Sequence, residues 1–249
     1  MRIIFSRKGF DSAAGGGASP IVDGRPISLP IPAGAASRTT YGALGLSEHA
    51  VKASRGKLGA DDLCHHDPMF RVDDCGKGEC LFGQCGAAQT HLERQGVGLG
   101  DVFVFFGLFR EEHDDGSRGE PHHRIFGYLE VEQIIELGEG APQALIDLGH
   151  PHALAMHHKN DVIYRGPGRV AEQASDALRL TVPEGPPSIW HRPKWLKRGG
   201  LSYHDKPVRW QQRGRLQSVA RGQEFVADIG RRQAPRDWLA GIMAEINRS

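Results

Sequence analysis

Two apolar runs on either side of a charged loop constrain the fold of this chain more than any other segment. The first run is Val102 to Phe106 and the second is Ile125 to Val131. Both are rich in the β-branched and aromatic residues that fit a pleated sheet. The loop between them is polar and strongly charged. The pattern predicts a long β-hairpin near the middle of the chain.

The composition favours short strands and ordered loops over a helical bundle. The chain has 249 residues, of which 33 are glycine and 15 are proline. This length suits one large domain or two small ones, and we expect a single domain over residues 1–249. Helices are expected at Ser47 to Ser54, Gly86 to Gln95 and Arg236 to Asn247, and further strands at Arg2 to Phe5, Asp161 to Arg165 and Leu178 to Val182.

The short N-terminal apolar run and the small number of cysteines predict a cytoplasmic location. The apolar run at the N-terminus is too short for a signal peptide, and no stretch of about 18 apolar residues occurs. We therefore expect a soluble protein that has no membrane partner. The four cysteines do not make a disulfide scaffold, and we expect them to remain thiols.

Charge is concentrated in one segment of the chain. The formal net charge is only +1, so the whole molecule exerts no general attraction on nucleic acid. Residues 188–216 nevertheless hold eight Lys and Arg side chains and one Asp, together with three tryptophans and a tyrosine. Cations can meet phosphates while aromatic faces stack on bases. The alternative is a solvated loop, and we expect at least two of these tryptophans to anchor it in the core.

The sharpest local motif for metal binding is the pair His65 and Asp67. A His-x-Asp pair can place an imidazole and a carboxylate on one metal ion, as in the facial triads of iron oxygenases. Iron or zinc would suit this pair, but the sequence does not select a third ligand among the 13 histidines. The alternative is a histidine that hydrogen-bonds a turn before Pro68. Cysteine-based zinc is not favoured, because the usual paired two-residue spacing is missing.

Several phrases spread along nearly the whole chain carry a family resemblance. They are Ser6 to Ser12 with Ser19-Pro20, Phe82 to Leu92, Gly96 to Arg110, His123 to Tyr128, His150 to His152, Tyr203-His204 and Gly222 to Val226. Together they resemble the third nucleotide modification-associated domain family. The hairpin also looks like the small PUA, EVE and ASCH-like barrels that bind RNA or modified bases. The resemblance implies an α+β fold: a mostly antiparallel PUA-like β-barrel decorated with short helices.

The resemblance also implies a partner and a set of site residues. That family is linked to DNA-base modification systems, so a nucleotide or nucleic acid is the expected partner, with DNA favoured over RNA. The polar positions that it carries over are Arg7, Lys8, Asp11, His65, Asp67, Gln89, His91, Arg110, His123, His150, His152, His204, Gln223 and Glu224.

Three functional hypotheses stay open at this point. In the first, the protein binds a nucleotide or modified base: Arg7, Lys8 and Arg110 meet phosphate, Gln89 and Gln223 read a base edge, and the histidines His91, His123, His150, His152 and His204 complete the lining. In the second, it is an enzyme in which Asp11, Asp67 or Glu224 is the general base, with a metal on His65 and Asp67 as the sharper variant. The third is a structural or partner-binding protein. The oligomeric state is left open.

Overall fold

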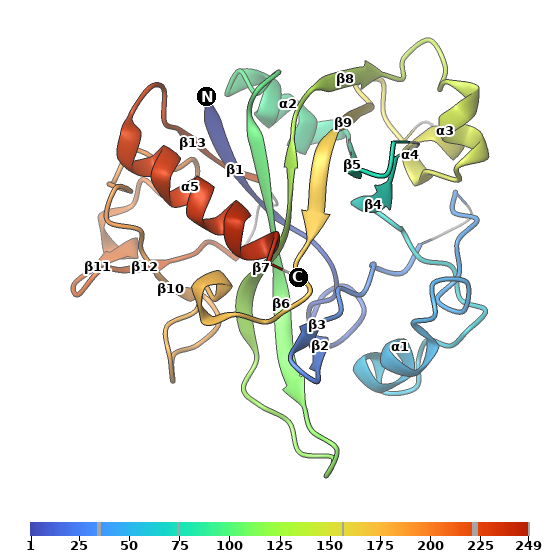
Figure 1. The fold of residues 1–249 in the computed structure, drawn as a ribbon, viewed down its shortest axis with the longest axis horizontal. Helices are drawn as coiled ribbons and strands as arrows, with labels where there is room; N and C mark the ends of the chain where they lie inside the picture. Colours follow the sequence, from blue (N-terminus) through green and yellow to red (C-terminus); the bar gives the residue numbers. More distant parts are fainter. Residues whose placement is uncertain (34–35, 74, 156, 221–223, 249) are drawn as a thin grey trace.

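The computed structural model describes residues 1–33, 36–73, 75–155, 157–220 and 224–248 (Figure 1). The larger sheet contains β1 (Arg2–Arg7), β2 (Ser19–Val22), β3 (Arg25–Pro26), β4 (Met69–Val72), β5 (Gly78–Gln84), β6 (Val102–Glu112), β7 (His122–Glu130), β8 (Gln133–Glu136), β9 (Val162–Val170) and β13 (Glu224–Asp228). A smaller sheet contains β10 (Ile189–His191), β11 (Trp210–Gln211) and β12 (Arg215–Gln217). The α-helices are α1 (Ser47–Ser54), α2 (Gly86–Arg94), α3 (Gln143–Asp147), α4 (Pro151–Leu154) and α5 (Gln233–Ile246), with 3-10 turns η1 (Asp176–Leu178) and η2 (Pro207–Arg209).

The predicted hairpin is confirmed as the pair β6 and β7. The two strands are antiparallel, with Val102 opposite Glu130 and Phe103 opposite Leu129. Successive residues of β6 enter different hydrophobic clusters. Val102, Val104 and Phe106 pack on one face of the sheet, whereas Phe103 and Phe105 pack on the other. This explains why the strand is a continuous apolar run and does not alternate with polar residues.

The large sheet is mixed and open. Its main path runs β13-β1-β6-β7-β9-β5-β4, with β1 and β2 parallel to β6 and the other pairs antiparallel. The α+β class is thus supported, but the described strands do not close into the expected barrel. The resemblance at the hairpin reflects one pair of strands, and closure depends on pairings between segments far apart in the chain.

Three predicted helices are confirmed, and one predicted strand is wrong. The segments expected to be helical correspond to α1, α2 and α5. Between Leu178 and Val182 the chain makes only isolated bridges, at Arg179 and Thr181, after the turn η1. The amides of Leu180 and Thr181 both donate to the carbonyl of His123, so this segment lies beside the start of β7 without forming a ladder.

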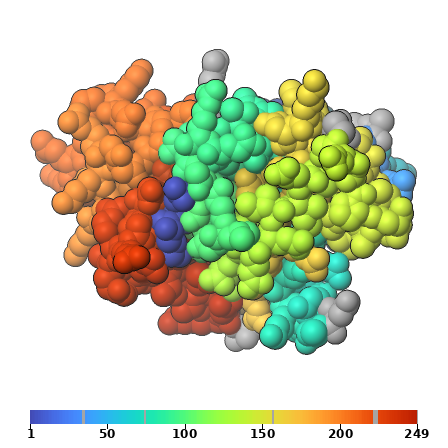
Figure 2. All heavy atoms as spheres, turned by 90° about the horizontal axis from the view of Figure 1, so that it is seen from above, coloured from blue at the N-terminus to red at the C-terminus, as the bar shows by residue number. Residues whose placement is uncertain are grey.

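Packing fixes the position of α4, which contains His152 and directly follows His150. Leu145 of α3 and Ala153 of α4 bury against Leu81 of β5 and Ile163 of β9. On the other side of the molecule α5 buries Leu239, Ile242 and Ile246 in the cluster that also receives the small sheet. Figures 1 and 2 show the small sheet and α3 at opposite ends of the molecule. The segment 188–216 is therefore remote from the α3–α4 end.

The first strand is held in place at its start by charge. The amide of Arg2 donates to Asp101 Oδ1 at 2.7 Å, and its guanidinium lies 3.4 Å from the same carboxylate. In Figure 2 the first residues (blue) lie between α5 (red) and the segment around residue 100 (green). Among the described residues, none of the helices is both long enough and apolar enough to cross a bilayer. The four cysteines are free thiols.

Candidate functional site

A cavity of about 630 Å³ opens where β1 and β5 end. Its volume lies within the range of pockets that hold small molecules and cofactors. Segments that are distant in the sequence form its walls. The lining residues are Arg7, Lys8, Gly9, Asp11, Ala14, Ile31, Pro32, Ala33, Ala36, Ser37, His65, Asp67, Gly83, Gln84, Cys85, His152, His157 and Ala220.

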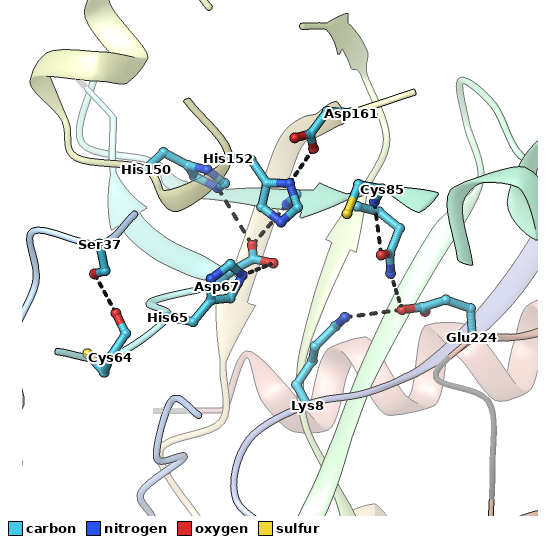
Figure 3. Close-up of polar contacts among 12 residues, drawn as sticks. Lys8, Ser37, Cys64, His65, Asp67, Cys85, His150, His152, Asp161 and Glu224 are labelled. Carbon is cyan, nitrogen blue, oxygen red and sulfur yellow. Dashed lines mark hydrogen bonds and ion pairs between the residues drawn. The ribbon is translucent and has the colours of Figure 1, made fainter. Parts of the chain in front are cut away.

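One wall of the cavity is a cluster of imidazoles around Asp67 (Figure 3). Asp67 Oδ2 lies 3.8 Å from His65 Nε2, and Oδ1 lies 3.6 Å from His150 Nε2. The amide of Gly83 donates to Oδ1 at 2.9 Å. The ring of His152 is 5.3 Å from that of His65. This wall therefore brings a carboxylate and three imidazoles from separate parts of the chain together.

The orientation of His152 depends on two neighbours. Its Nδ1 bonds to the buried carboxylate of Asp161, whose second oxygen accepts from the amide of His157. On the other side, the ring lies against Gly83, where any Cβ atom would overlap it. A glycine at this position of β5 gives the imidazole the space to enter the wall.

Burial sets the charge state of this wall. It lowers the pKa of His65 to about 4, although the carboxylate of Asp67 partly opposes the shift. Burial alone would raise the pKa of Asp67, but the imidazoles of His150, His152 and His65 outweigh it and hold this pKa below its usual value. At neutral pH the wall therefore presents a carboxylate beside a neutral imidazole, the forms that bind metal ions.

The cavity lining also contains two cations, and these have different partners. Lys8 Nζ lies 3.1 Å from Glu224 Oε1, which also accepts from Gln84 at 2.8 Å. Arg7 instead donates to the carbonyls of Val219 and Ala220, at 2.9 and 3.0 Å. Burial lowers the pKa of Arg7 from its usual value, but a guanidinium stays protonated at neutral pH. Lys8 is thus paired directly with a carboxylate, whereas Arg7 is held by carbonyl groups and has Asp11 as a nearby opposite charge.

The structure brings only some of the nominated residues together. Those in the cavity lining are Arg7, Lys8, Asp11, His65, Asp67 and His152, and His150 and Glu224 contact them from behind. The others within the described chain are placed outside this lining: Gln89, His91, Arg110, His123 and His204. Gln223 lies outside the described residues.

The nominated residues outside the cavity lining have other contacts. Gln89 accepts from the hydroxyl of Tyr164 and donates to Glu93. His91 stacks against Tyr203, with ring centroids 4.4 Å apart. His123 accepts from the indole of Trp190, and His204 accepts from the amide of Val219. Arg110 lies on β6 opposite Pro20. Three of these five, Gln89, His123 and His204, are buried polar groups that find hydrogen-bond partners within the fold.

The aromatic residues of the basic segment mostly anchor it, as expected. Trp190 is buried, and Trp195 and Trp210 pack partly buried against the same core cluster. Tyr203 is the exception, with 49% of its surface exposed. The segment therefore offers cations to a partner but few rings for stacking.

Sequence reasoning did not nominate four residues that shape the site. Gly83, Gln84 and Cys85 end β5 and line the cavity, and Asp161 orients His152. The first three lie within the resemblance phrase Phe82 to Leu92, which could have drawn attention to them. Nothing in the sequence links Asp161 to His152, because the contact arises from the turn after α4.

The residues of this cavity lie within a stretch of sequence that matches a known protein family. A family model described as nucleotide modification associated domain 3 matches residues 2–228. The chain belongs to this family. The match contains every described residue that lines the cavity, and α5 lies wholly outside it. No curated protein and no solved structure matches the chain.

Proposed function

We propose that this protein binds a nucleotide or a modified base in the cavity and acts in nucleic-acid base modification. The observation that carries the proposal is a cavity of about 630 Å³ whose lining combines Arg7 with the imidazole and carboxylate cluster of His65, Asp67 and His152. Such a volume accommodates a heterocycle with its sugar and phosphate. Membership of a nucleotide modification associated family supports the same ligand class.

Two charged residues of the lining, Arg7 and Asp11, suit different parts of a nucleotide. The guanidinium of Arg7 has N–H groups beyond those bound to the two carbonyls, and arginine pairs well with phosphate oxygens. Asp11 Oδ1 accepts from the amides of Ala13 and Ala14, which fixes the carboxylate at the cavity edge. Its other oxygen is placed to accept from the exocyclic amine of a base. We propose DNA in preference to RNA as the source of the base.

A second candidate is an enzyme that alters the bound base or nucleotide. It is favoured by the deep carboxylate of Asp67 with neutral His65 beside it, facing the same cavity. Asp11 and Asp67 both line the cavity and remain candidates for the general base. Glu224 suits that role less well, because Lys8 and Gln84 share its Oε1 and its side chain is 1% exposed.

Binding can be tested with the four deoxynucleoside monophosphates and a short DNA strand, using calorimetry in the presence of EDTA. We expect Arg7→Gln to weaken binding at least tenfold, since hydrogen bonds to charged groups contribute about 1.5–3 kcal/mol. Arg231→Gln, an exposed arginine outside the cavity lining, is the matched control. Equal affinity of the two variants, or no binding by the unaltered protein, would refute the proposal.

The nucleosides found in cells distinguish a binding protein from an enzyme. Nucleosides from cells with and without the gene can be compared by mass spectrometry, together with cells that carry Asp67→Asn. If the protein is an enzyme, a modified nucleoside appears with the gene and disappears with Asp67→Asn. If it only binds, Asp67→Asn leaves the nucleoside pattern unchanged while Arg7→Gln reduces ligand binding.

A further inference from the structure

We propose that His65, Asp67 and His152 bind one divalent transition-metal ion in the wall of the cavity. Each offers one ligand atom, and these atoms all lie within 4.8 Å of one another. The three side chains come from the segment before β4 and from α4, and all three line the cavity. His152 is thus the third ligand that the His65 and Asp67 pair lacks in the sequence.

The spacing within the cluster suits ligands of one ion better than direct partners. His65 Nε2 and Asp67 Oδ2 are 3.8 Å apart, which is too far for a hydrogen bond. Two ligand atoms at about 2.1 Å from an ion lie about 3.0 to 3.4 Å apart, depending on the angle between them. The atoms of His65 and Asp67 would have to approach by about 0.4–0.8 Å, and ligand atoms at the 4.8 Å limit by at most about 1.8 Å, to complete the coordination.

The surroundings of the ligands are those of a built metal site. The bond from His152 Nδ1 to Asp161 leaves Nε2 as the free ligand atom, and in Figure 3 the ring lies between Asp161 and Asp67. Metal-bound histidines usually have such a carboxylate behind them, and it fixes both the tautomer and the ring direction. Gly83 donates to Asp67 Oδ1, so Oδ2 is the oxygen directed to the ion.

His150 provides an independent sign that this wall is incomplete without an ion. The side chain is fully buried, and neither ring nitrogen has a hydrogen-bond partner among the described residues. Its Nε2 nevertheless lies 3.6 Å from Asp67 Oδ1. A buried imidazole without a partner is costly. Movement of the Asp67 carboxylate onto an ion would let His150 donate to the outer oxygen.

Two imidazoles and one carboxylate leave further coordination positions open, and these face the cavity. This ligand set is found in catalytic zinc sites and in non-haem iron(II) sites. The charged residues of the described lining are Arg7, Lys8, Asp11 and Asp67, whose formal charges cancel. A divalent ion would make the cavity positive. It would then attract a phosphate or activate a bound water.

A competing ligand set shares His152. Cys85, His152 and Asp161 also have ligand atoms within 4.8 Å of one another. In that arrangement Asp161 would bind the ion, but both of its oxygens already accept hydrogen bonds and it is buried outside the described cavity lining. The geometry therefore favours His65, Asp67 and His152, with Asp161 as the group that orients His152.

The test uses the full chain, stripped with EDTA and titrated with Zn²⁺ or Co²⁺ alone. We expect one equivalent to bind, with visible Co²⁺ absorption bands and a higher midpoint of thermal unfolding. His65→Ala, Asp67→Asn and His152→Ala should each weaken binding about 100-fold or more. Cys85→Ser and His113→Ala, the latter an exposed histidine, should bind as the unaltered chain does.

Two results would overturn the proposal. One is the absence of stoichiometric binding by the unaltered protein. The other is loss of binding in Cys85→Ser while His65→Ala retains it, which would assign the ion to the competing set. His65→Gln provides a milder variant if His65→Ala fails to fold, and thermal melting in EDTA shows whether each variant is folded.

The inference deepens the proposed function, because it concerns the same cavity, but it can fail separately. Metal binding is measured without nucleotide, and nucleotide binding is measured in EDTA. Arg7→Gln should bind Co²⁺ normally, since Arg7 is not one of the ligands and its hydrogen bonds are to the carbonyls of Val219 and Ala220. If the ion binds and no nucleotide does, the metal site stands and the proposed function falls; the reverse result removes the metal alone.

Discussion

The imidazole of His152 lies against the backbone of Gly83 so closely that no Cβ atom fits between them. Gly83 also donates its amide to Asp67, so one residue of β5 fixes both a carboxylate and an imidazole in the cavity wall. The site is therefore sensitive to a single methyl group at this position.

Gly83→Ala should displace His152 and destabilise the protein by about 1–3 kcal/mol, the usual cost of overpacking a well-packed interior. Urea unfolding checks this. Gly98→Ala is the matched control, because a Cβ there meets no atom closer than 4.0 Å and the residue lies at an ordinary backbone conformation. Unfolding free energies that match for the two variants would show that His152 adapts without cost.

Lys8→Met should destabilise the protein by about 3–5 kcal/mol, because it leaves Glu224 as a buried charge without its cation. The side chain of Glu224 is 1% exposed and that of Lys8 is 11% exposed. The double variant Lys8→Met with Glu224→Gln should recover most of the loss, since a neutral amide then replaces the carboxylate. Chemical unfolding of the two variants and the unaltered chain measures this, and a loss below about 1 kcal/mol for Lys8→Met would contradict the prediction.

Acid should destabilise the protein partly through His123. Burial, with the charges of Arg7 and His122, lowers the pKa of His123 to about 3, whereas an unfolded histidine titrates near 6.5. Between these two pH values the imidazole of His123 is protonated in the unfolded chain but stays neutral in the folded chain. The free energy of unfolding therefore falls as the pH decreases from about 6.5 to 3 and is unaffected by His123 above that window.

His123→Gln isolates this contribution, because a glutamine oxygen can still accept from the indole of Trp190. Between pH 6.5 and 4 the free energy of unfolding of this variant should fall less steeply than that of the unaltered chain. Urea unfolding at each pH measures this difference. Parallel curves for the two proteins would mean that His123 titrates normally in the fold.

Gly241→Ala should stabilise the protein by about 0.5–1 kcal/mol, since alanine is the better helix former. Gly241 lies exposed within α5, and a Cβ there meets nothing within 4 Å. The midpoints of thermal and urea unfolding should both increase, and the binding assays for metal and nucleotide should give the same result as for the unaltered chain. A decrease in stability would show that α5 needs flexibility at this turn.

Local patterns in the sequence predicted the elements better than their assembly. The apolar run of β6 and the helix formers of α2 act over a few residues, so their structure could be read directly. Closure of the sheet depends on pairings such as Ile4 with Val226, which no local pattern specifies. The expected barrel failed for that reason.

The site was partly predictable for a similar reason. Arg7, Asp11, His65 and Asp67 were nominated from their chemistry, and the fold places them around one cavity. His123 has the same chemistry but accepts from Trp190 in the interior. Residue type alone does not tell a buried polar group that is satisfied within the fold from one that faces a ligand.

The position of β1 has a consequence for how the protein is made. This strand is paired on one side with β6 and on the other with β13, so its neighbours are synthesised about 100 and 220 residues later. Arg7 and Lys8 are synthesised more than 200 residues before Val219, Ala220 and Glu224, the residues that they contact. A nascent chain therefore cannot complete this part of the cavity lining before β13 has been synthesised.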